Sequence, residues 1–252
     1  MVELTLILPS INPDRWVDIQ QQLKSSVGKY SYELIASGPR DNPASYSSDL
    51  GRFKFIETLA CPSVAFQRAA EFADGKFLAL IPDDMALDEK GFEQALDLMQ
   101  DKPSDHGMVL RYSEGGHNQD QNPEYWRGRY HEDQRLEGIK EEWLLAPAFL
   151  YNANHFKGLG GLDCSLEHVN LNGHSIAYVT QHRGGKMHLS PSRIFQAGWA
   201  PPTQATILYR AYLENDKPKF TEFWNKSNAA DVYNVQFDNW RTQPSKWPRR
   251  YG

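Results

Sequence analysis

The sequence has few of the features that mark a secreted, membrane-spanning or nucleic-acid-binding protein. Only two cysteines occur in 252 residues, too few for a disulfide framework, and this favours a reducing, cytoplasmic compartment. No run approaches the roughly 18 apolar residues that a spanning helix needs, and no signal-type segment begins the chain. Basic residues are not in excess, because the formal net charge is -5, which argues against a nucleic-acid partner. We therefore predict a soluble globular protein with peripheral membrane contact at most.

The first 100 residues alternate between short apolar runs and helical patterns. At 40% hydrophobic residues the chain can bury a sizeable core. The runs predict strands at 4–8, 32–36, 53–59 and 77–82, and the helical patterns predict helices from Trp16, at 64–73 and at 91–100. Such alternation predicts a mostly parallel sheet with right-handed crossovers, which is an α/β fold.

The pattern changes after residue 107. We predict strands at 108–112, 143–151 and 186–189, and helices at 174–183 and 205–213. The polar stretch 113–142 holds Tyr125 and Trp126, so we expect a functional loop that closes over a ligand or presents aromatic faces to it. Aromatic and basic residues recur between 240 and 250, where they could contact a partner or an anionic membrane.

Two adjacent carboxylates, Asp83 and Asp84, end the apolar run FLALIPDDM. Open α/β sheets bind their ligands at the carboxyl ends of their strands. Neighbouring carboxylates repel each other unless a cation compensates them, and a divalent metal that carries a phosphorylated ligand does so commonly. The alternative is a solvated turn that only ends a strand.

Four motifs, in order along the first 190 residues, resemble the family 2 glycosyltransferases, which have the GT-A fold. LTLILPSIN resembles that family's first strand and nucleotide loop, and QRAAEFADGKF has the spacing of the segment before its metal motif. IPDDM lies where the family carries its DXD motif, and FKGLGGLD is similar to its Gly-Gly-Phe-Asp segment. The resemblance implies a GT-A domain at 1–190, with a donor half at 1–105 and an acceptor half at 106–190, followed by a C-terminal extension at 191–252.

The resemblance also implies which residues hold the donor. Asp84 matches the metal-binding Asp of the DXD motif, and Asp83 is the middle residue, close to the ribose or to the metal through water. The metal would be Mn²⁺ or Mg²⁺, which neutralises the leaving diphosphate. The family often adds a downstream histidine, for which His188 and His182 are the candidates, and we select His188. The nucleotide contacts implied on the protein are Pro9, Ser10, Asn12, Ser37 and Arg68.

The acceptor side departs from the family, whose catalytic base is the Asp of a Glu-Asp pair at the start of a helix. If Glu167 and His168 match this pair, the base position holds His168, and the helix predicted to follow is too short. If the helix at 174–183 is matched instead, His174 is the only titratable group near the base position. We prefer the second register for the helix. Since the usual base is a carboxylate, we select Glu167 as base, with His174 and Asp163 as alternatives.

The expected function is an inverting, metal-dependent transfer of a sugar from a nucleotide-sugar to a hydroxyl group of a glycan or glycoconjugate. A UDP-sugar is favoured over GDP- and dTDP-sugars, although Ser37 stands where the family usually has an Asp that recognises the nucleoside. Two alternatives remain. One is a nucleotidyltransferase that makes the nucleotide-sugar, and the other is a non-catalytic binding relative of the fold.

Overall fold

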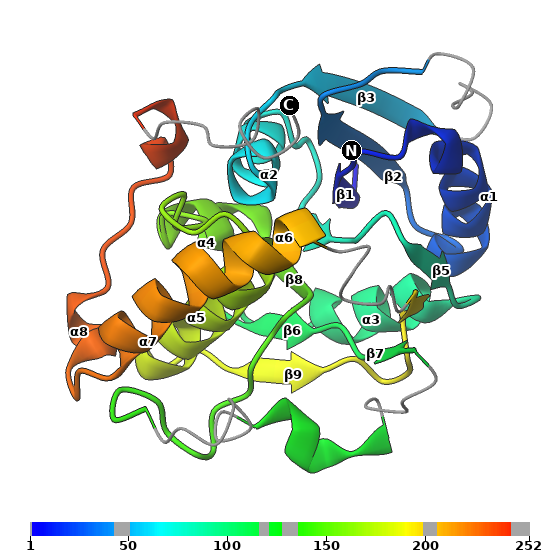
Figure 1. Cartoon of the computed structure of the whole chain (residues 1–252). Coiled ribbons are helices and arrows are strands. Elements are labelled where there is room, and N and C mark those ends of the chain that lie inside the picture. Colours follow the sequence, from blue (N-terminus) through cyan, green and yellow to red (C-terminus); the bar gives the residue numbers. More distant parts are fainter. Residues whose placement is uncertain (1, 43–50, 116–120, 128–135, 199–205, 243–252) are drawn as a thin grey trace.

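A computed structural model of the chain describes residues 2–42, 51–115, 121–127, 136–198 and 206–242. A seven-stranded sheet crosses the molecule in the order β3-β2-β1-β4-β8-β6-β9 (Figure 1). Its strands are β1 (Leu4–Pro9), β2 (Tyr32–Gly38), β3 (Arg52–Glu57), β4 (Phe77–Leu80), β6 (Gly107–Val109), β8 (Phe149–Asn152) and β9 (Met187–Leu189). Only β8 runs antiparallel to its neighbours, so the predicted mostly parallel α/β sheet is confirmed.

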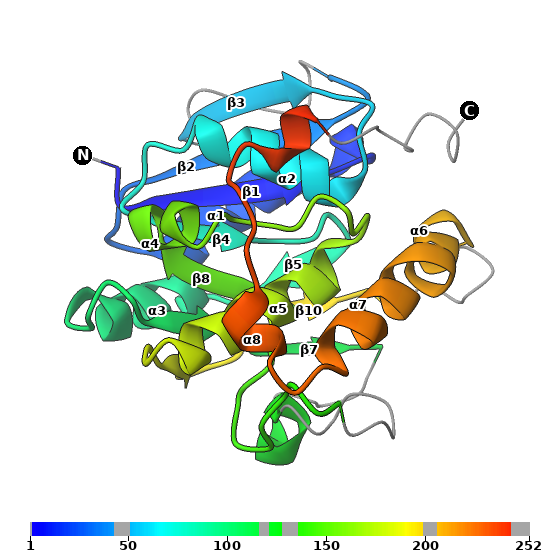
Figure 2. The same ribbon diagram turned by 90° about the vertical axis from the view of Figure 1, so that its left-hand side faces the viewer.

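Helices cover both faces of this sheet (Figures 1 and 2). They are α1 (Trp16–Val27), α2 (Pro62–Glu71), α3 (Gly91–Gln100), α4 (Ala153–Gly158) and α5 (Val169–His182). The connection from β1 to β2 runs toward the β3 edge of the sheet, whereas the connection from β3 to β4 runs in the opposite direction, past β2 and β1. Because both crossovers are right-handed, α1 and α2 lie on opposite faces of the sheet. Helix α3 packs against α1, and α5 packs against α2.

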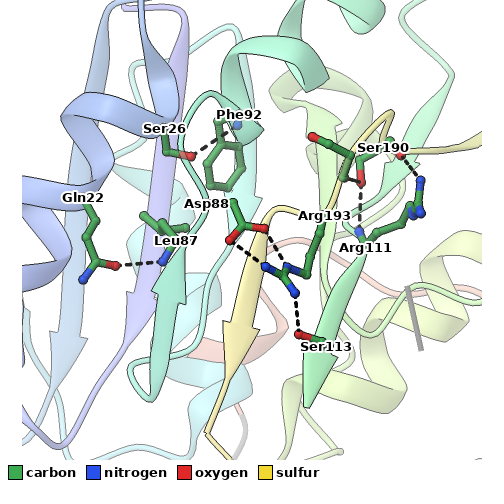
Figure 3. A network of polar contacts seen from close by, with 10 residues as sticks. Gln22, Ser26, Leu87, Asp88, Phe92, Arg111, Ser113, Ser190 and Arg193 are labelled. Atoms are coloured by element: carbon green, nitrogen blue, oxygen red, sulfur yellow. Dashed lines mark hydrogen bonds and ion pairs between the residues drawn. The ribbon is translucent and has the colours of Figure 1, made fainter. Parts of the chain in front are cut away.

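A second, three-stranded sheet lies beside the carboxyl end of β4. It contains β5 (Met85–Leu87), β10 (Phe195–Ala197) and β7 (Tyr112–Glu114), with β10 in the centre. Arg193 joins two parts of this sheet, because its guanidinium donates to the Asp88 carboxylate at 2.6 and 3.1 Å and to the Ser113 hydroxyl at 3.2 Å (Figure 3). The carboxylate of Asp88 is therefore used in this ion pair.

The C-terminal part of the chain packs over α5 and returns to α2. It contains α6 (Thr206–Ala211), a π-helix (Tyr212–Asp216), α7 (Lys217–Trp224) and α8 (Ala229–Val232), and it then runs back across the molecule (Figure 2). Trp224 donates to the Ser175 hydroxyl on α5 at 3.0 Å, and Arg241 pairs with Glu71 on α2 at 2.7 Å. The rest of the predicted aromatic and basic cluster, from residue 243 on, lies outside the described residues.

Three predicted elements differ from the structure. The strand predicted at 108–112 is divided between β6 and β7. The strand predicted at 143–151 is reduced to β8, because the backbone N–H and C=O groups of Leu144 form hydrogen bonds with the Gln181 side chain of α5 and not with a strand. Helix α5 begins at Val169 and not at His174, so it is long enough for the register that matches Glu167 and His168 to the family's Glu-Asp pair, and the preference for the other register is wrong. Within the described part of the chain, no helix has the length and apolar character needed to cross a bilayer.

The core joins the layers through aromatic side chains. Phe66 of α2 is fully buried and packs edge-on against Phe149 of β8 and Phe156 of α4, with ring centroids 5.6 and 5.7 Å apart. We expect Phe66→Ala to lower the free energy of unfolding by about 3–5 kcal/mol, since it removes a buried ring and leaves a cavity. Urea denaturation measures this.

Phe72, one residue past the end of α2, is the matched control because 55% of its surface is exposed. Phe72→Ala should change the free energy of unfolding by no more than about 0.5 kcal/mol. Equal losses in the two variants would contradict the assigned core.

Candidate functional site

A pocket of about 410 Å³ opens at the carboxyl ends of β1, β2 and β4, between the two sheets. One wall consists of the loops after these strands, and the opposite wall consists of β7 and β10 together with the start of α5. The residues that carry polar groups or rings into it are Ser10, Asn12, Ser37, Asp83, Asp84, Tyr112, Glu114, His168, Asn170 and Phe195. Its place agrees with the rule for open α/β sheets.

Asp83 fixes the loop that follows β1. Its Oδ2 atom accepts hydrogen bonds from the Ser10 hydroxyl at 2.9 Å, from the backbone N–H groups of Ile11 and Asn12 at 3.2 and 3.3 Å, and from the Asn12 side-chain amide at 3.0 Å. The indole of Trp16 also donates to the Ser10 hydroxyl, at 2.9 Å. The predicted nucleotide loop and the DXD-like motif are thus one hydrogen-bonded unit.

Asp84 lies beside this unit and is exposed at the pocket. Desolvation raises the pKa of the Asp84 carboxyl and the charge of Asp83 raises it further, whereas a backbone hydrogen bond and the positive charge of Arg15 lower it. Excess negative charge on two hard oxygen ligands fits Mg²⁺ or Mn²⁺, which need only one or two protein carboxylates when phosphates and water complete the shell. The residues present therefore fit the predicted metal.

Ser37 lies at the end of β2, on the floor of the pocket. Its side chain is fully buried, and its hydroxyl has no hydrogen-bond partner among the described residues. Gly38 follows, where a Cβ atom would collide with the carbonyl oxygen of Ser10, so no side chain fits there. An unsatisfied buried hydroxyl in a pocket is a position where a ligand can supply the missing bond.

Two predicted ligand-binding residues are not among those that line the pocket. Arg68 donates to the Thr58 hydroxyl at 2.8 Å and lies over the ring of Trp240, on the outer side of α2. His188 is in β9, where its Nε2 lies 3.0 Å from Nδ1 of His106. Within the described ranges, no three His, Cys, Asp or Glu side chains gather closely enough to hold a metal, so His188 does not complete a site with Asp83 and Asp84.

The three residues predicted for the base also lie outside the pocket lining. Asp163 accepts from the backbone N–H of Ser165 at 2.9 Å in a tight turn, and it borders a different cavity, under α7. His174 is buried inside α5, where its Nδ1 accepts from the backbone N–H of Ala146 at 3.1 Å. Glu167 is 4% exposed and lies two residues before the first residue of α5.

His168 caps α5 and does line the pocket. Its Nδ1 accepts from the backbone N–H of Asn170 at 3.1 Å. Burial lowers the pKa of the imidazole to about 4, so the ring is neutral at pH 7. A neutral ring whose Nδ1 accepts must carry its proton on Nε2. His168 thus offers the pocket a hydrogen-bond donor.

Asp216 holds the loop that carries His168. Its carboxylate is fully buried and accepts from the backbone N–H groups of Glu167 at 2.8 Å and His168 at 2.6 Å, and from the Asn215 amide at 2.7 Å. Burial raises the pKa of Asp216 against the lowering effect of these bonds. The carboxylate comes from the π-helix, a geometry in which Asn215 and Asp216 both point inward.

Sequence reasoning missed Asp216, Tyr112 and Glu114. The alternation of Tyr112 and Glu114 along β7 was a usable signal, because residues two apart share one face of a strand. No local sequence pattern marks Asp216, because its role depends on a hydrogen bond with the backbone of His168, 48 residues earlier in the chain.

Comparison with solved structures assigns the fold. TarS from S. aureus, residues 1–349, matches with a TM-score of 0.59 at 14% identity over 97% of this chain and 73% of that one. The mannosyltransferase PcManGT from Pyrobaculum calidifontis, in complex with GDP-Man and Mn²⁺, matches with a TM-score of 0.58 at 10% identity over 99% and 68% of the two chains. The predicted glycosyltransferase fold is therefore confirmed.

Other similar structures include TarS 1–349 in complex with UDP-GlcNAc, with a TM-score of 0.57 at 11% identity over 97% of this chain and 74% of that one. The chain spans only 39% of a longer TarS structure. No protein-family model and no curated protein sequence matches the chain.

The hydrogen bonds that the Asp216 carboxylate accepts from the backbone of Glu167 and His168 form what we call the Asp216 clamp, and amide exchange at these residues tests it. Asp216→Asn replaces one acceptor oxygen by an NH₂ group that faces an N–H donor. We expect the free energy of unfolding to fall by about 1–3 kcal/mol and amide exchange at residues 167–170 to accelerate. Hydrogen exchange read by mass spectrometry or NMR checks this.

Asn152 provides the matched control, because it caps α4 by accepting from the backbone N–H groups of Asn154 and His155 at 3.0 and 3.3 Å. Asn152→Ala should lower stability by about 1 kcal/mol without changing exchange at 167–170. Unchanged protection of these residues in Asp216→Asn would refute the clamp.

The lowered pKa of His168 predicts a pH dependence of stability. The unfolded histidine takes up a proton near its usual pKa of 6.5, whereas the folded one remains neutral down to about 4. The unfolded state therefore binds more protons in this window, and stability falls as the pH decreases. From pH 7.5 to 5 the wild type should lose on the order of 1–2 kcal/mol more than His168→Asn. Urea titrations of both proteins at pH 7.5 and at pH 5 measure this difference. Equal losses of unfolding free energy in the two proteins would contradict the lowered pKa of His168.

Proposed function

We propose that the chain is a glycosyltransferase that moves a sugar from a nucleotide-diphosphate-sugar to a hydroxyl group of a glycan or glycoconjugate, with inversion at the sugar carbon. The observation that carries this proposal is the unit of Asp83 with the loop after β1, which places the exposed Asp84 beside it in one pocket. The glycosyltransferase fold supports it, as do UDP, UDP-GlcNAc and GDP-Man in similar structures.

The donor would lie across the carboxyl ends of β1, β2 and β4. Pro9, Ser10 and Asn12 would border the nucleoside and its phosphates, and the hydroxyl of Ser37 would bond to the base or ribose. Asp84 would hold a Mn²⁺ or Mg²⁺ ion, with Asp83 close by. When bound, such an ion supplies charge neutralisation at the leaving diphosphate.

The start of α5 contributes a second polar group. His168 presents a neutral N–H donor from Nε2, which suits an oxygen of the sugar or of a phosphate. The register that pairs Glu167 and His168 with the family's Glu-Asp pair now has a helix of 14 residues behind it, which supports the resemblance on the acceptor side.

The two alternatives predict different chemistry. A nucleotidyltransferase of this fold uses a glycine-rich loop with Arg or Lys against a triphosphate, and no Arg or Lys belongs to the described residues that line this pocket. This favours the sugar transferase. A non-catalytic relative would bind a nucleotide-sugar without releasing the nucleoside diphosphate.

A thermal-shift panel of UDP, GDP, dTDP and their sugars, with and without Mn²⁺, tests the donor site. A ligand at about 100 times its Kd stabilises the folded state by about 2.7 kcal/mol, which corresponds to a rise in Tm of roughly 5–10 °C. We expect a UDP-sugar to give the largest rise, and only with Mn²⁺. No rise with any member would refute the donor site.

Asp84→Ala tests the metal role. Release of nucleoside diphosphate from the donor should fall on the order of 10²-fold or more, because the leaving group loses its charge compensation. Asp18→Ala, at an exposed position on α1, is the matched control and should release it at the wild-type rate. Undiminished release by Asp84→Ala would overturn the metal assignment.

A further inference from the structure

The backbone of Asp84 is held by β10, the central strand of the small sheet. The N–H group of Gly198 donates to the carbonyl oxygen of Asp84 at 2.8 Å. A Cβ atom at Gly198 would lie 3.1 Å from this oxygen and 4.0 Å from Oδ2 of the Asp84 carboxylate. The Asp84 side chain therefore lies beside the end of β10, and the pairing of β5 with β10 decides where its carboxylate is placed.

This pairing is short. Three residues of each strand pair in an antiparallel register that begins with Met85 opposite Ala197. One further bond follows at the other end, where the N–H group of Asp88 donates to the carbonyl oxygen of Ile194 at 2.8 Å. A slip of one residue would displace Asp84 by about 3.3 Å along β10 and turn its side chain to the other face of the sheet. Side-chain contacts must therefore help to fix the register.

Arg193 supplies such a contact. Its guanidinium donates to both carboxylate oxygens of Asp88, at 2.6 and 3.1 Å, one residue beyond the end of β5 (Figure 3). Two bonds between a planar guanidinium and a carboxylate allow only a narrow range of geometry. A slip of β5 along β10 by one residue would carry Asp88 about 3.3 Å away and break both bonds. The ion pair thus favours the register in which Asp84 reaches the pocket.

The same guanidinium also fixes β7. It donates to the Ser113 hydroxyl at 3.2 Å, so that one side chain joins the strands on both sides of β10. Tyr112 and Glu114, the neighbours of Ser113, line the pocket, and alternation along a strand places Ser113 on the other face. Arg193 is not among the described residues that line the pocket, and it contacts the small sheet from the face that points away from it.

We propose that Arg193 is a positioning residue for the Asp84 carboxylate. This assignment rests on the function proposed above, in which Asp84 holds the metal ion. Arg193 acts through Asp88 and through the register of β5 on β10. Its removal should therefore lower the affinity for the metal while every group that contacts the donor stays in the chain.

Arg193→Met tests the assignment in the full chain, because it removes the guanidinium and keeps most of the apolar stem. Mn²⁺ binding in the presence of UDP, and separately of GDP, is measured from the electron paramagnetic resonance signal of the free ion. We expect the Kd for Mn²⁺ to rise by about 10–100-fold, the usual effect of losing a residue that orients a metal ligand without touching the metal. Amide hydrogen exchange at 84–88 and 194–198 should accelerate.

A titration of activity with Mn²⁺ separates positioning from loss of folded protein. UDP-GlcNAc and GDP-mannose serve as donors, with water as the acceptor. In Arg193→Met the half-saturating Mn²⁺ concentration should rise by the same factor as the Kd, and the rate at saturating Mn²⁺ should approach that of the wild type. A variant that is only less folded would lose rate at every Mn²⁺ concentration.

Two further variants sharpen the result. Asp88→Asn keeps one acceptor oxygen for Arg193 and should raise the Kd for Mn²⁺ by a smaller factor, so it also serves if Arg193→Met does not fold. Arg241→Met removes a guanidinium from the pair with Glu71 on the outer side of α2, where the two groups lie 2.7 Å apart. It should bind Mn²⁺ as the wild type does.

Three outcomes would overturn the role of Arg193 while the glycosyltransferase proposal stands. They are wild-type affinity for Mn²⁺ in both Arg193→Met and Asp88→Asn, an equal loss of affinity in Arg241→Met, and a lower rate at saturating Mn²⁺ with unchanged affinity. If the wild type binds no Mn²⁺ with either nucleotide and cleaves neither donor, the proposed function itself fails, and the role of Arg193 fails with it.

Discussion

A single carboxylate oxygen, Oδ2 of Asp83, organises the loop after β1 on one side of the pocket. The loop after β1 has backbone N–H groups that no strand or helix satisfies, and Asp83 accepts two of them together with two side-chain donors. A hydrogen bond to a charged acceptor contributes about 1.5–3 kcal/mol to the stability of the folded state, and a buried donor without a hydrogen bond lowers that stability. Asp216 acts in the same way on the other side, where it satisfies the backbone at Glu167 and His168. The pocket is therefore enclosed by two loops that depend on carboxylates supplied by distant segments.

Much of the fold follows from local sequence. Strands β1, β2 and β4 are buried on both faces, so they read as unbroken apolar runs, and Gly28 ends α1 with a positive φ that a glycine adopts without strain. Asp83 and Asp84 lie at the end of β4 as expected, beside the loop 9–12. The strands, the turn at Gly28 and the two carboxylates depend on residues near one another in the chain, and so a single sequence reveals them, whereas their place beside the loop 9–12 follows from the rule for open α/β sheets.

The opposite side of the pocket depends on contacts that local patterns do not contain. Each strand of the small sheet has three residues, which is too short for a periodic signal, so the sequence predicts the end of a strand at Tyr112 and a loop at Glu114. The start of α5 at Val169 is set by His168 and by Asp216, and propensity alone placed it five residues later. Glu167 is the carboxylate that the sequence predicts as the base, but the fold buries its side chain.

The bonds from Asp216 to residues 167 and 168 also order the assembly of the molecule in time. The loop after β1 has its acceptor in Asp83 once β4 has been synthesised, whereas the backbone N–H groups of Glu167 and His168 have no carboxylate acceptor until Asp216, 48 residues beyond His168, has been added. At about 5–20 residues per second this interval lasts roughly 2–10 s. The loop after β1 therefore gains its carboxylate before the segment at 167–168 does, and the π-helix is the last of these elements to be synthesised.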